Sequence, residues 1–155
     1  MTWIPINNEE GMDKYSPVTQ AYGICFNELG EILILDQNGK KEWTLPGGTV
    51  EVDESPRDTL KREVNEEANV LLKNISLLGV QMVDDPNNSD LEHRLYYQAR
   101  YIAKIDRLLP QSPDPAKGRV HTRLFVPANK VTDYVKWGET GVAIFADAVK
   151  AHKNI

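Results

Sequence analysis

The first third of the chain alternates apolar and polar residues with a period of two, which predicts strands. Four side chains share one face of the first predicted strand, residues 18–26: Val18, Tyr22, Ile24 and Phe26. A short turn leads into a second apolar run at residues 32–35. Asn38-Gly39 is a strong hairpin signal, and it predicts that the chain returns as a third strand at residues 41–45.

Beyond residue 70, some segments repeat apolar residues with the period of a strand and others with the period of a helix. Three further strands are predicted, at residues 77–83, 93–105 and 120–126. Pro127 opens a short helix. Four apolar residues mark an amphipathic helix at the end of the chain: Val142, Phe145, Ala146 and Val149. Because another helix is predicted before residue 70, this order is typical of an α/β fold with a mixed sheet between helices.

The helix before residue 70 is predicted from its start signals and its apolar face. Ser55 suits the N-cap, Pro56 the first helical position and Asp58 the third, where a carboxylate favours the positive helix end. From there the helix can run to about Ala68. Four apolar residues recur at helical spacing on one face: Leu60, Val64, Ala68 and Leu71.

Three glutamates of this helix, Glu63, Glu66 and Glu67, share an arc of about 100° beside the apolar face. Like charges at this spacing destabilise a helix by a few tenths of a kcal/mol per pair. A divalent cation such as Mg²⁺ removes the conflict, since it takes oxygen ligands and keeps waters that phosphates can replace. The alternative is an acidic helix face in solvent. That alternative does not account for the preceding turn at residues 46–48, whose two glycines allow the backbone to approach a ligand closely.

The spacing of glycine and carboxylate residues from Gly48 to Val70 resembles the signature of the Nudix hydrolases. That signature is a glycine, five residues, Glu, seven residues, and then Arg-Glu-apolar-x-Glu-Glu-x-Gly-apolar. Gly48, Glu54 and Arg62 stand at the required spacing, and the rest follows with one exception. Asn69 stands where the family has Gly. Because Asn is the usual second choice for a left-handed residue after a helix, we expect a small loss of stability and no effect on the chemistry.

The resemblance covers residues 17–150 and implies an α/β/α sandwich with a mixed β-sheet. We place a Nudix hydrolase domain at residues 17–155 and leave residues 1–16 unassigned. The resemblance also implies hydrolysis of the pyrophosphate linkage of a nucleoside diphosphate joined to another moiety. Water would attack phosphorus, with Mg²⁺ or Mn²⁺ as the cofactor.

The resemblance implies a role for each matching residue of the motif. The metal-binding groups would be the principal ligands Glu63 and Glu67, with Glu66 nearby and the Gly47 carbonyl completing the shell. Arg62 would orient Glu63 by a charged hydrogen bond. Glu54 would tie the loop to the helix, and Gly48 is structural in the motif.

The position of the general base and the substrate stay open at this point. The family places its base on a helix glutamate, here Glu63 or Glu66, or on a carboxylate of a later loop. The loop candidates are Asp84, Asp85, Asp90 and Glu92. Residues 84–87 resemble a loop of some ADP-ribose pyrophosphatases, although Asp-Pro-Asn is also an ordinary turn. Nucleoside triphosphates, diadenosine polyphosphates and nucleotide sugars are further candidate substrates.

A catalytically silent nucleotide-binding sensor with the same fold is the alternative function. Loss of the helix carboxylates would mark such a protein, and all three glutamates are present.

The strand predicted at residues 93–105 offers a wall for the substrate. One face is typical of a core: Leu95, Tyr97, Ala99, Tyr101 and Ala103. The other face could stack a base and bind phosphate: Arg94, Tyr96, Gln98 and Arg100. We expect Tyr96 to stack on the base and Arg94 to bind the charged portion, the alternative being an exposed sheet face.

Composition narrows the partners. With 155 residues, 41% of them hydrophobic, the chain is long enough for one domain with a substantial core. Its net charge of −5 argues against nucleic-acid polymers and anionic membranes as partners, and it leaves a homodimer open.

The single cysteine, Cys25, lies in an apolar strand and is expected to be a buried thiol. The chain shows neither a signal-peptide pattern nor a long apolar run, so we expect a cytoplasmic protein. The three histidines, His93, His121 and His152, are too separated to predict a zinc site.

Overall fold

The computed structural model describes residues 1–36, 38–89 and 94–155, and its strands form one mixed sheet. The strands are β1 (Thr2–Pro5), β2 (Val18–Phe26), β3 (Glu31–Asp36), β4 (Trp43–Thr44), β5 (Gly47–Thr49), β6 (Val70–Asp84), β7 (Leu95–Leu108) and β8 (Thr122–Pro127). Their order is β1-β6-β7-β2-β3-β4, with β5 paired to β2 and β8 paired to β3. β2 and β7 are parallel, and the other pairs are antiparallel, so the predicted mixed sheet is confirmed.

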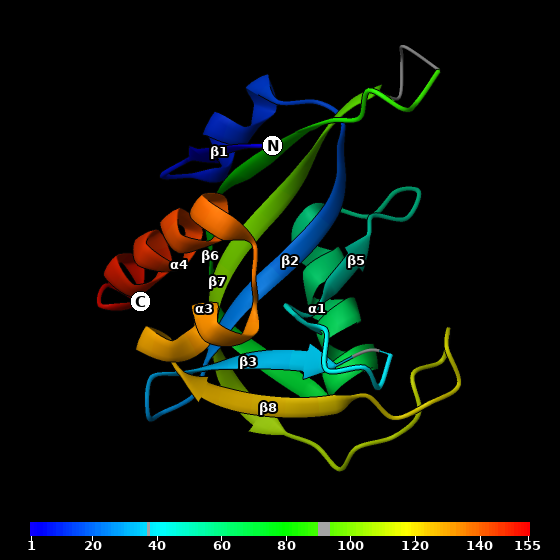
Figure 1. Ribbon diagram of the computed structural model, residues 1–155, viewed down its shortest axis with the longest axis vertical. Helices are drawn as coiled ribbons and strands as arrows, with labels where there is room; N and C mark the ends of the chain where they lie inside the picture. The colour runs from blue at the N-terminus through cyan, green and yellow to red at the C-terminus, as the bar shows by residue number, and fades with distance from the viewer. Residues whose placement is uncertain (37, 90–93) are drawn as a thin grey trace.

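Two longer helices cover the two faces of this sheet (Figure 1). The helical segments are η1 (Glu9–Lys14), α1 (Pro56–Ala68), η2 (Ala128–Lys130), α3 (Val131–Tyr134) and α4 (Gly138–His152). α1 packs against β2, β5 and β6, and α4 packs on the opposite face. The predicted α/β/α arrangement is therefore confirmed. None of the helices in the described part of the chain is both long and apolar enough to cross a membrane.

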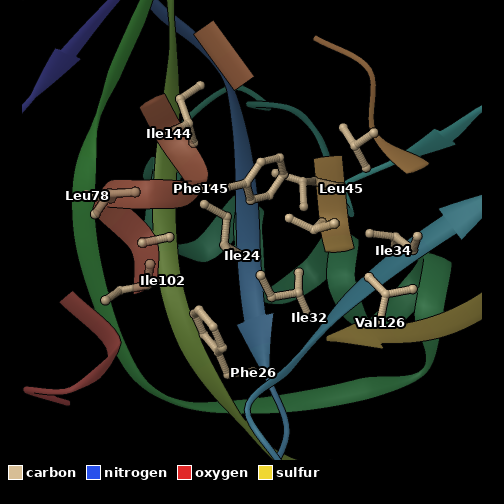
Figure 2. Close-up of a cluster of buried hydrophobic side chains, with 13 residues drawn as sticks. Ile24, Phe26, Ile32, Ile34, Leu45, Leu78, Ile102, Val126, Ile144 and Phe145 are labelled. Carbon is tan, nitrogen blue, oxygen red and sulfur yellow. The ribbon is translucent and has the colours of Figure 1, made fainter. Parts of the chain in front are cut away.

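The core on the α4 side joins strands from both halves of the sheet. Phe26, Ile102 and Phe145 lie in one cluster with neighbours from β3, β6 and β8, which Figure 2 shows converging beneath α4. Each fully buried side chain of this size contributes about 1.5–3 kcal/mol relative to an exposed one. This cluster therefore holds α4 in place, and it fixes the segment just before α4, which reaches a pocket described below.

The core on the α1 side holds the acidic helix against β2. Leu60 and Val64 are fully buried there, and Leu60 lies over Gly23, where an added Cβ would be 2.7 Å from its Cδ1. Cys25 is buried in the same cluster, as predicted, and burial raises the pKa of its thiol to about 12. Because this packing fixes the rotation of α1 about its axis, it also fixes the direction in which the opposite face of the helix points.

Three predicted faces are wrong in detail. Val18 packs on the α1 side rather than with Tyr22, because the register of β2 shifts between Val18 and Gln20. Leu71 lies in β6 and not on the helix, since α1 ends at Ala68. In α4 the buried stripe contains Ile144 and Ala148 with Phe145, whereas Val142 is 57% exposed.

Strand bounds also differ from the prediction. β6 begins at Val70 rather than 77, and the polar residues Lys73 and Asn74 lie at a break in its register. Such an irregularity interrupts the period of two that identifies a strand in sequence. β7 is described from Leu95, which is 40% exposed, and the predicted start at His93 lies outside the described residues.

The first sixteen residues, left unassigned by sequence, contact the edge of the sheet and the helices on both of its faces. β1 pairs with β6 at the sheet edge, and Gly79 permits the approach, because a Cβ there would lie 2.3 Å from the carbonyl oxygen of Ile4. Trp3 donates to Asp147 of α4 at 2.8 Å. Arg57 of α1 donates through Nε to Glu9 at 2.7 Å.

Candidate metal and nucleotide site

The glycine turn before α1 is shaped by two carboxylates. The Gly47 N–H donates to Oε1 of Glu67 at 2.8 Å in a buried hydrogen bond. An added Cβ at Gly48 would lie 2.5 Å from the carboxyl carbon of Glu63, so a larger residue there would displace that carboxylate. The turn thus places its backbone directly against the two glutamates that the motif implies as metal ligands.

Arg62 is the centre of the charge network around this turn. It contacts Glu54 twice, through Nε at 2.8 Å and Nη2 at 3.0 Å, and it donates to Glu63 from Nη1 at 3.0 Å. Nη2 also donates to the carbonyl of Thr49 at 3.1 Å, and Nη1 reaches Glu66 at 3.3 Å. Hydrogen bonds from Arg62 lower the pKa of Glu54 to about 2. This geometry is the one expected if Arg62 orients Glu63 and Glu54 joins loop to helix.

Glu67 is a buried acid with an unfavourable charge. Burial raises its pKa to about 8; the Gly47 N–H counteracts this shift, and the charge of Glu63 adds to it. Burial also raises the pKa of Glu63. A buried acid and a half-buried acid held close together in this way require a compensating positive charge before both can ionise. A divalent cation supplies that charge.

The loop between β7 and β8 brings a third carboxylate to the same place. Asp114 and His121 are 3% and 2% exposed, and their ligand atoms and that of Glu67 lie within 4.8 Å of one another. His121 Nε2 contacts Asp114 Oδ2 at 2.9 Å, and the Ala116 N–H donates to Asp114 Oδ1 at 2.9 Å. Although burial raises the pKa of Asp114, these hydrogen bonds hold it below its usual value. Asp114 is therefore a preformed anion beside Glu67.

The donor set fits a hard divalent cation. Glu63, Glu67 and Asp114 offer carboxylate oxygens, which Mg²⁺ and Mn²⁺ prefer. His121 Nδ1 is buried and has no hydrogen-bond partner among the described residues. His121 and Asp114 were not proposed from the sequence. The loop around Asp114, with Pro110, Pro113 and Pro115, gives no periodic signal, and only folding brings a residue 47 positions after Glu67 back to that side chain.

Asn69 connects this loop to the end of the acidic helix. It adopts the left-handed conformation predicted for it, with φ 55°. Its Oδ1 accepts from the Ser112 N–H at 2.8 Å, and its Nδ2 donates to Ser112 Oγ at 3.0 Å. Glycine at this position could not make either bond. Asn69 therefore fixes the start of the segment that leads to Asp114.

Replacing Asn69 by Gly should loosen this loop. Each lost hydrogen bond costs about 1 kcal/mol, which the relief of the left-handed conformation offsets by a similar amount. We expect a small net loss of stability and faster hydrogen exchange of the Ser112 amide, while the Leu109 amide, bonded to the Asn69 carbonyl, stays protected. Hydrogen exchange followed by NMR measures both amides.

The matched control is Asn74→Gly, because Asn74 is also left-handed, with φ 52°, and is exposed. That variant should leave the Ser112 amide unchanged. Equal exchange of Ser112 in wild type and Asn69→Gly would show that the side chain of Asn69 does not hold the loop.

A pocket of about 450 Å³ lies beside the glycine turn. Three residues of the predicted polar face line it: Tyr96, Gln98 and Arg100. Tyr22 lines it too and pairs with Gly47 in the sheet, so the pocket and the acidic site share this part of β2. Burial raises the pKa of Tyr22, and the charges of Glu67 and Glu63 add to the shift. The polar face is thus a pocket wall and not an open sheet surface.

Other predicted residues lie elsewhere. Arg94 is absent from the pocket lining and forms an exposed ion pair with Asp84 at 2.6 Å. Asp85 accepts from the Asn87 N–H in a local turn. Neither Asp84 nor Asp85 belongs to the cluster around Glu67 within the described residues. Asp90 and Glu92 lie outside the described residues.

A turn that brings backbone against paired acids, beside a pocket on an α/β/α fold, is suited to binding a divalent cation and phosphate groups. The family model described as the NUDIX domain matches residues 17–142. The chain therefore belongs to the NUDIX domain family.

Two relatives are similar over part of the chain. Diphosphoinositol polyphosphate phosphohydrolase 2 of Rattus norvegicus is 31% identical over 102 residues, covering 64% of this chain and 54% of that protein. The "Probable DHNTP pyrophosphohydrolase" of Lactococcus lactis is 30% identical over 105 residues, covering 64% of this chain and 63% of that protein. The matched segments thus span between about half and two thirds of these relatives.

Solved structures agree on the fold. The Bacillus subtilis pyrophosphohydrolase BsRppH superposes with a TM-score of 0.67 at 19% identity, covering 88% of this chain and 84% of that one. An Ap4A hydrolase of C. elegans superposes with a TM-score of 0.65 at 16% identity, covering 90% and 100%. At these identities the likeness establishes the fold alone.

Proposed function

We propose that this chain is a metal-dependent hydrolase that cleaves the pyrophosphate linkage of a nucleoside diphosphate derivative. The observation that supports this best is the position of Glu63 and Glu67 against the glycine turn, with Asp114 and His121 within 4.8 Å of the ligand atom of Glu67, next to a pocket with aromatic walls. The phosphates, held by a metal ion, would occupy the acidic site at the turn, and the base would occupy the pocket. The relatives whose printed names are phosphohydrolase and pyrophosphohydrolase agree with this chemistry.

Each residue would have a defined task. Glu63 and Glu67 would hold Mg²⁺ or Mn²⁺ with Asp114, and Glu66 and the Gly47 carbonyl would complete the shell. A bound divalent cation would neutralise pyrophosphate charge and lower the pKa of a coordinated water. Arg62 keeps Glu63 in one orientation, and the Gly47 N–H does so for Glu67. Fixed ligands of this kind reduce the reorganisation needed during the reaction.

Asp114 joins Glu63 and Glu66 as a candidate general base. Its low pKa and its hydrogen bond from His121 suit an ionised group with a fixed direction. Asp114→Asn keeps the size of the side chain and removes its charge. We expect a fall in turnover of about 10²-fold, typical of losing an acid-base group. Steady-state kinetics measures the fall, with the exposed Asp106→Asn as control.

Metal titration of the Asp114→Asn variant then separates two roles. Unchanged affinity for Mn²⁺ with low turnover would indicate a base, and weakened affinity would indicate a ligand. Wild-type turnover in this variant would remove Asp114 from the mechanism.

The pocket favours a nucleotide over a highly phosphorylated sugar. Tyr22, Tyr96 and Trp137 line it, and aromatic rings stack on bases. Arg100 and Lys136 are the cationic side chains among its described lining residues, few for a ligand with many phosphates. Tyr96 remains our candidate for base stacking, and Arg94 could contact only a part of the substrate that extends beyond the pocket.

The test is a panel of nucleotides incubated with Mg²⁺ or Mn²⁺, followed by identification of the products. Nucleoside triphosphates, diadenosine polyphosphates, nucleotide sugars and ADP-ribose should be included. Release of a nucleotide by cleavage within a pyrophosphate supports the proposal. Tight nucleotide binding without turnover of any member would favour the silent sensor instead.

A further inference from the structure

Arg100 is a cation buried in the wall of the 450 Å³ pocket. It lies on β7 beside Tyr22 of β2 and is 4% exposed. Its guanidinium carbon is 4.7 Å from the ring centre of Tyr22 and 4.9 Å from that of Trp137. Trp137 is itself held by Phe145, with ring centres 6.1 Å apart. Packing against two fixed rings leaves the guanidinium one orientation.

The hydrogen bonds of Arg100 leave donors unused. Its Nη2 donates to the amide oxygens of Gln81 at 2.6 Å and Gln98 at 3.1 Å. Its Nε is buried and has no partner within the described residues. Burying an unpaired donor of a charged group is costly, so an acceptor that reached the guanidinium would be favoured.

The two glutamines make the pocket wall rich in donors. Because their oxygens accept from Arg100, their amide nitrogens point elsewhere. Gln81 Nε2 contacts the weak acceptor Met1 Sδ at 2.9 Å, and Gln98 Nε2 donates to Gln20. A ligand edge that meets the guanidinium of Arg100 is therefore favoured when it presents acceptors. An amino group there would face the N–H groups of Arg100.

Between the N7 edges of the purine bases, this requirement selects one. Guanine and hypoxanthine carry two adjacent acceptors, O6 and N7, which a guanidinium can bind together. Adenine has N7 beside an amino group, and that amino group is a donor. A pocket of 450 Å³ is large enough for a purine.

We propose that Arg100 determines base specificity by binding the O6 and N7 edge of a 6-oxopurine nucleotide in this pocket. The proposal rests on the proposed function, because it takes the bound nucleotide to be the substrate of that site. It then names the class of that substrate. Guanine and hypoxanthine nucleotides are then preferred over adenine nucleotides.

Calorimetric binding of nucleoside monophosphates tests this directly, because GMP, IMP and AMP contain no pyrophosphate to cleave. We expect GMP and IMP to bind about ten- to a hundredfold more tightly than AMP, as one bidentate base contact allows. 7-Deaza-GMP, which lacks only the N7 acceptor, should lose much of this advantage. Equal binding of GMP and AMP, or of GMP and 7-deaza-GMP, would overturn the proposal.

Two variants assign the preference to Arg100. Arg100→Met should bring GMP and AMP close to parity, while Arg107→Met, an exposed arginine of the same strand, should keep the wild-type ratio. Circular dichroism shows whether Arg100→Met folds. If it does not fold, the wild-type ranking of the four ligands still decides the question.

Other outcomes separate this inference from the proposed function. Metal-dependent turnover of nucleotides without any base preference would overturn the specificity of Arg100 and leave the proposed function standing. A guanine preference without turnover of any substrate would support Arg100 and contradict the hydrolase. Binding of inositol hexakisphosphate with displacement of GMP would overturn the pocket as a base site.

Discussion

Removal of divalent cations by EDTA should abolish turnover, and Mg²⁺ or Mn²⁺ should restore it. The physical reason is the charge at the site. Ionised carboxylates at Glu67 and Asp114, with Glu63 at the adjacent glycine turn, repel a pyrophosphate unless a cation lies between them and the substrate. Arg62 cannot replace the metal, because it is already bonded to Glu54 and Glu63. Initial rates measured in chelator, then with added metal, check this expectation.

Metal binding should also be visible without turnover. The metal-free folded protein, once EDTA has been removed, contains closely spaced acids, so added Mn²⁺ should raise its melting temperature by binding only the folded state. Thermal melts with and without Mn²⁺ measure this. Full activity in chelator, or a melting temperature that Mn²⁺ does not change, would contradict the assignment of the metal site.

The acidic helix was predictable because its signals are local. Ser55 caps α1 by accepting from the Asp58 N–H, and the helix ends at Ala68 with Asn69 left-handed, as the sequence indicated. The family resemblance depends on spacing within this one segment, and the family model agrees with it. Capping and helical periodicity involve neighbours in sequence, so tertiary packing had little to overturn.

The remainder of the site depends on contacts between distant residues. Asp114 lies near Glu67 in a loop that two long-range contacts help to hold: Asn69 accepts from the Ser112 N–H, and Arg123 donates to the Ala68 carbonyl at 2.8 Å. The predicted effect of Asn69 was a small loss of stability and nothing else. The structure adds a connection to the loop, which a pattern of residues 48–70 has no means of indicating.

Prediction of the pocket from the sequence was limited in the same way. The polar face of β7 was predicted from a period of two, but its cover was not, because Trp137 comes from the segment before α4. A strand pattern cannot tell a solvated face from a pocket wall. Here burial of Arg100 makes the difference, since only the fold places Tyr22 and Trp137 against it.

Glu67→Gln should lower turnover by at least about 10²-fold while the protein stays folded, because a preorganised charge at the reacting centre is lost. The amide oxygen can still accept from the Gly47 N–H, so the turn should keep its shape. Steady-state kinetics measures the loss. Asp58→Asn, which alters an exposed carboxylate of the same helix, is the control and should stay near the wild-type rate.

The same variant should change the pH dependence of stability in chelator. Because the pKa of Glu67 is raised from 4.5 to about 8, the folded wild type retains a proton that the unfolded chain releases. Its free energy of unfolding should therefore fall as the pH rises from about 4.5 to about 8. Glu67→Gln carries no such proton, so its stability should decline less over this range and exceed that of wild type near pH 8. Urea unfolding at several pH values measures both curves. Parallel curves together with near-normal turnover would show that Glu67 is neither a buried acid nor a metal ligand.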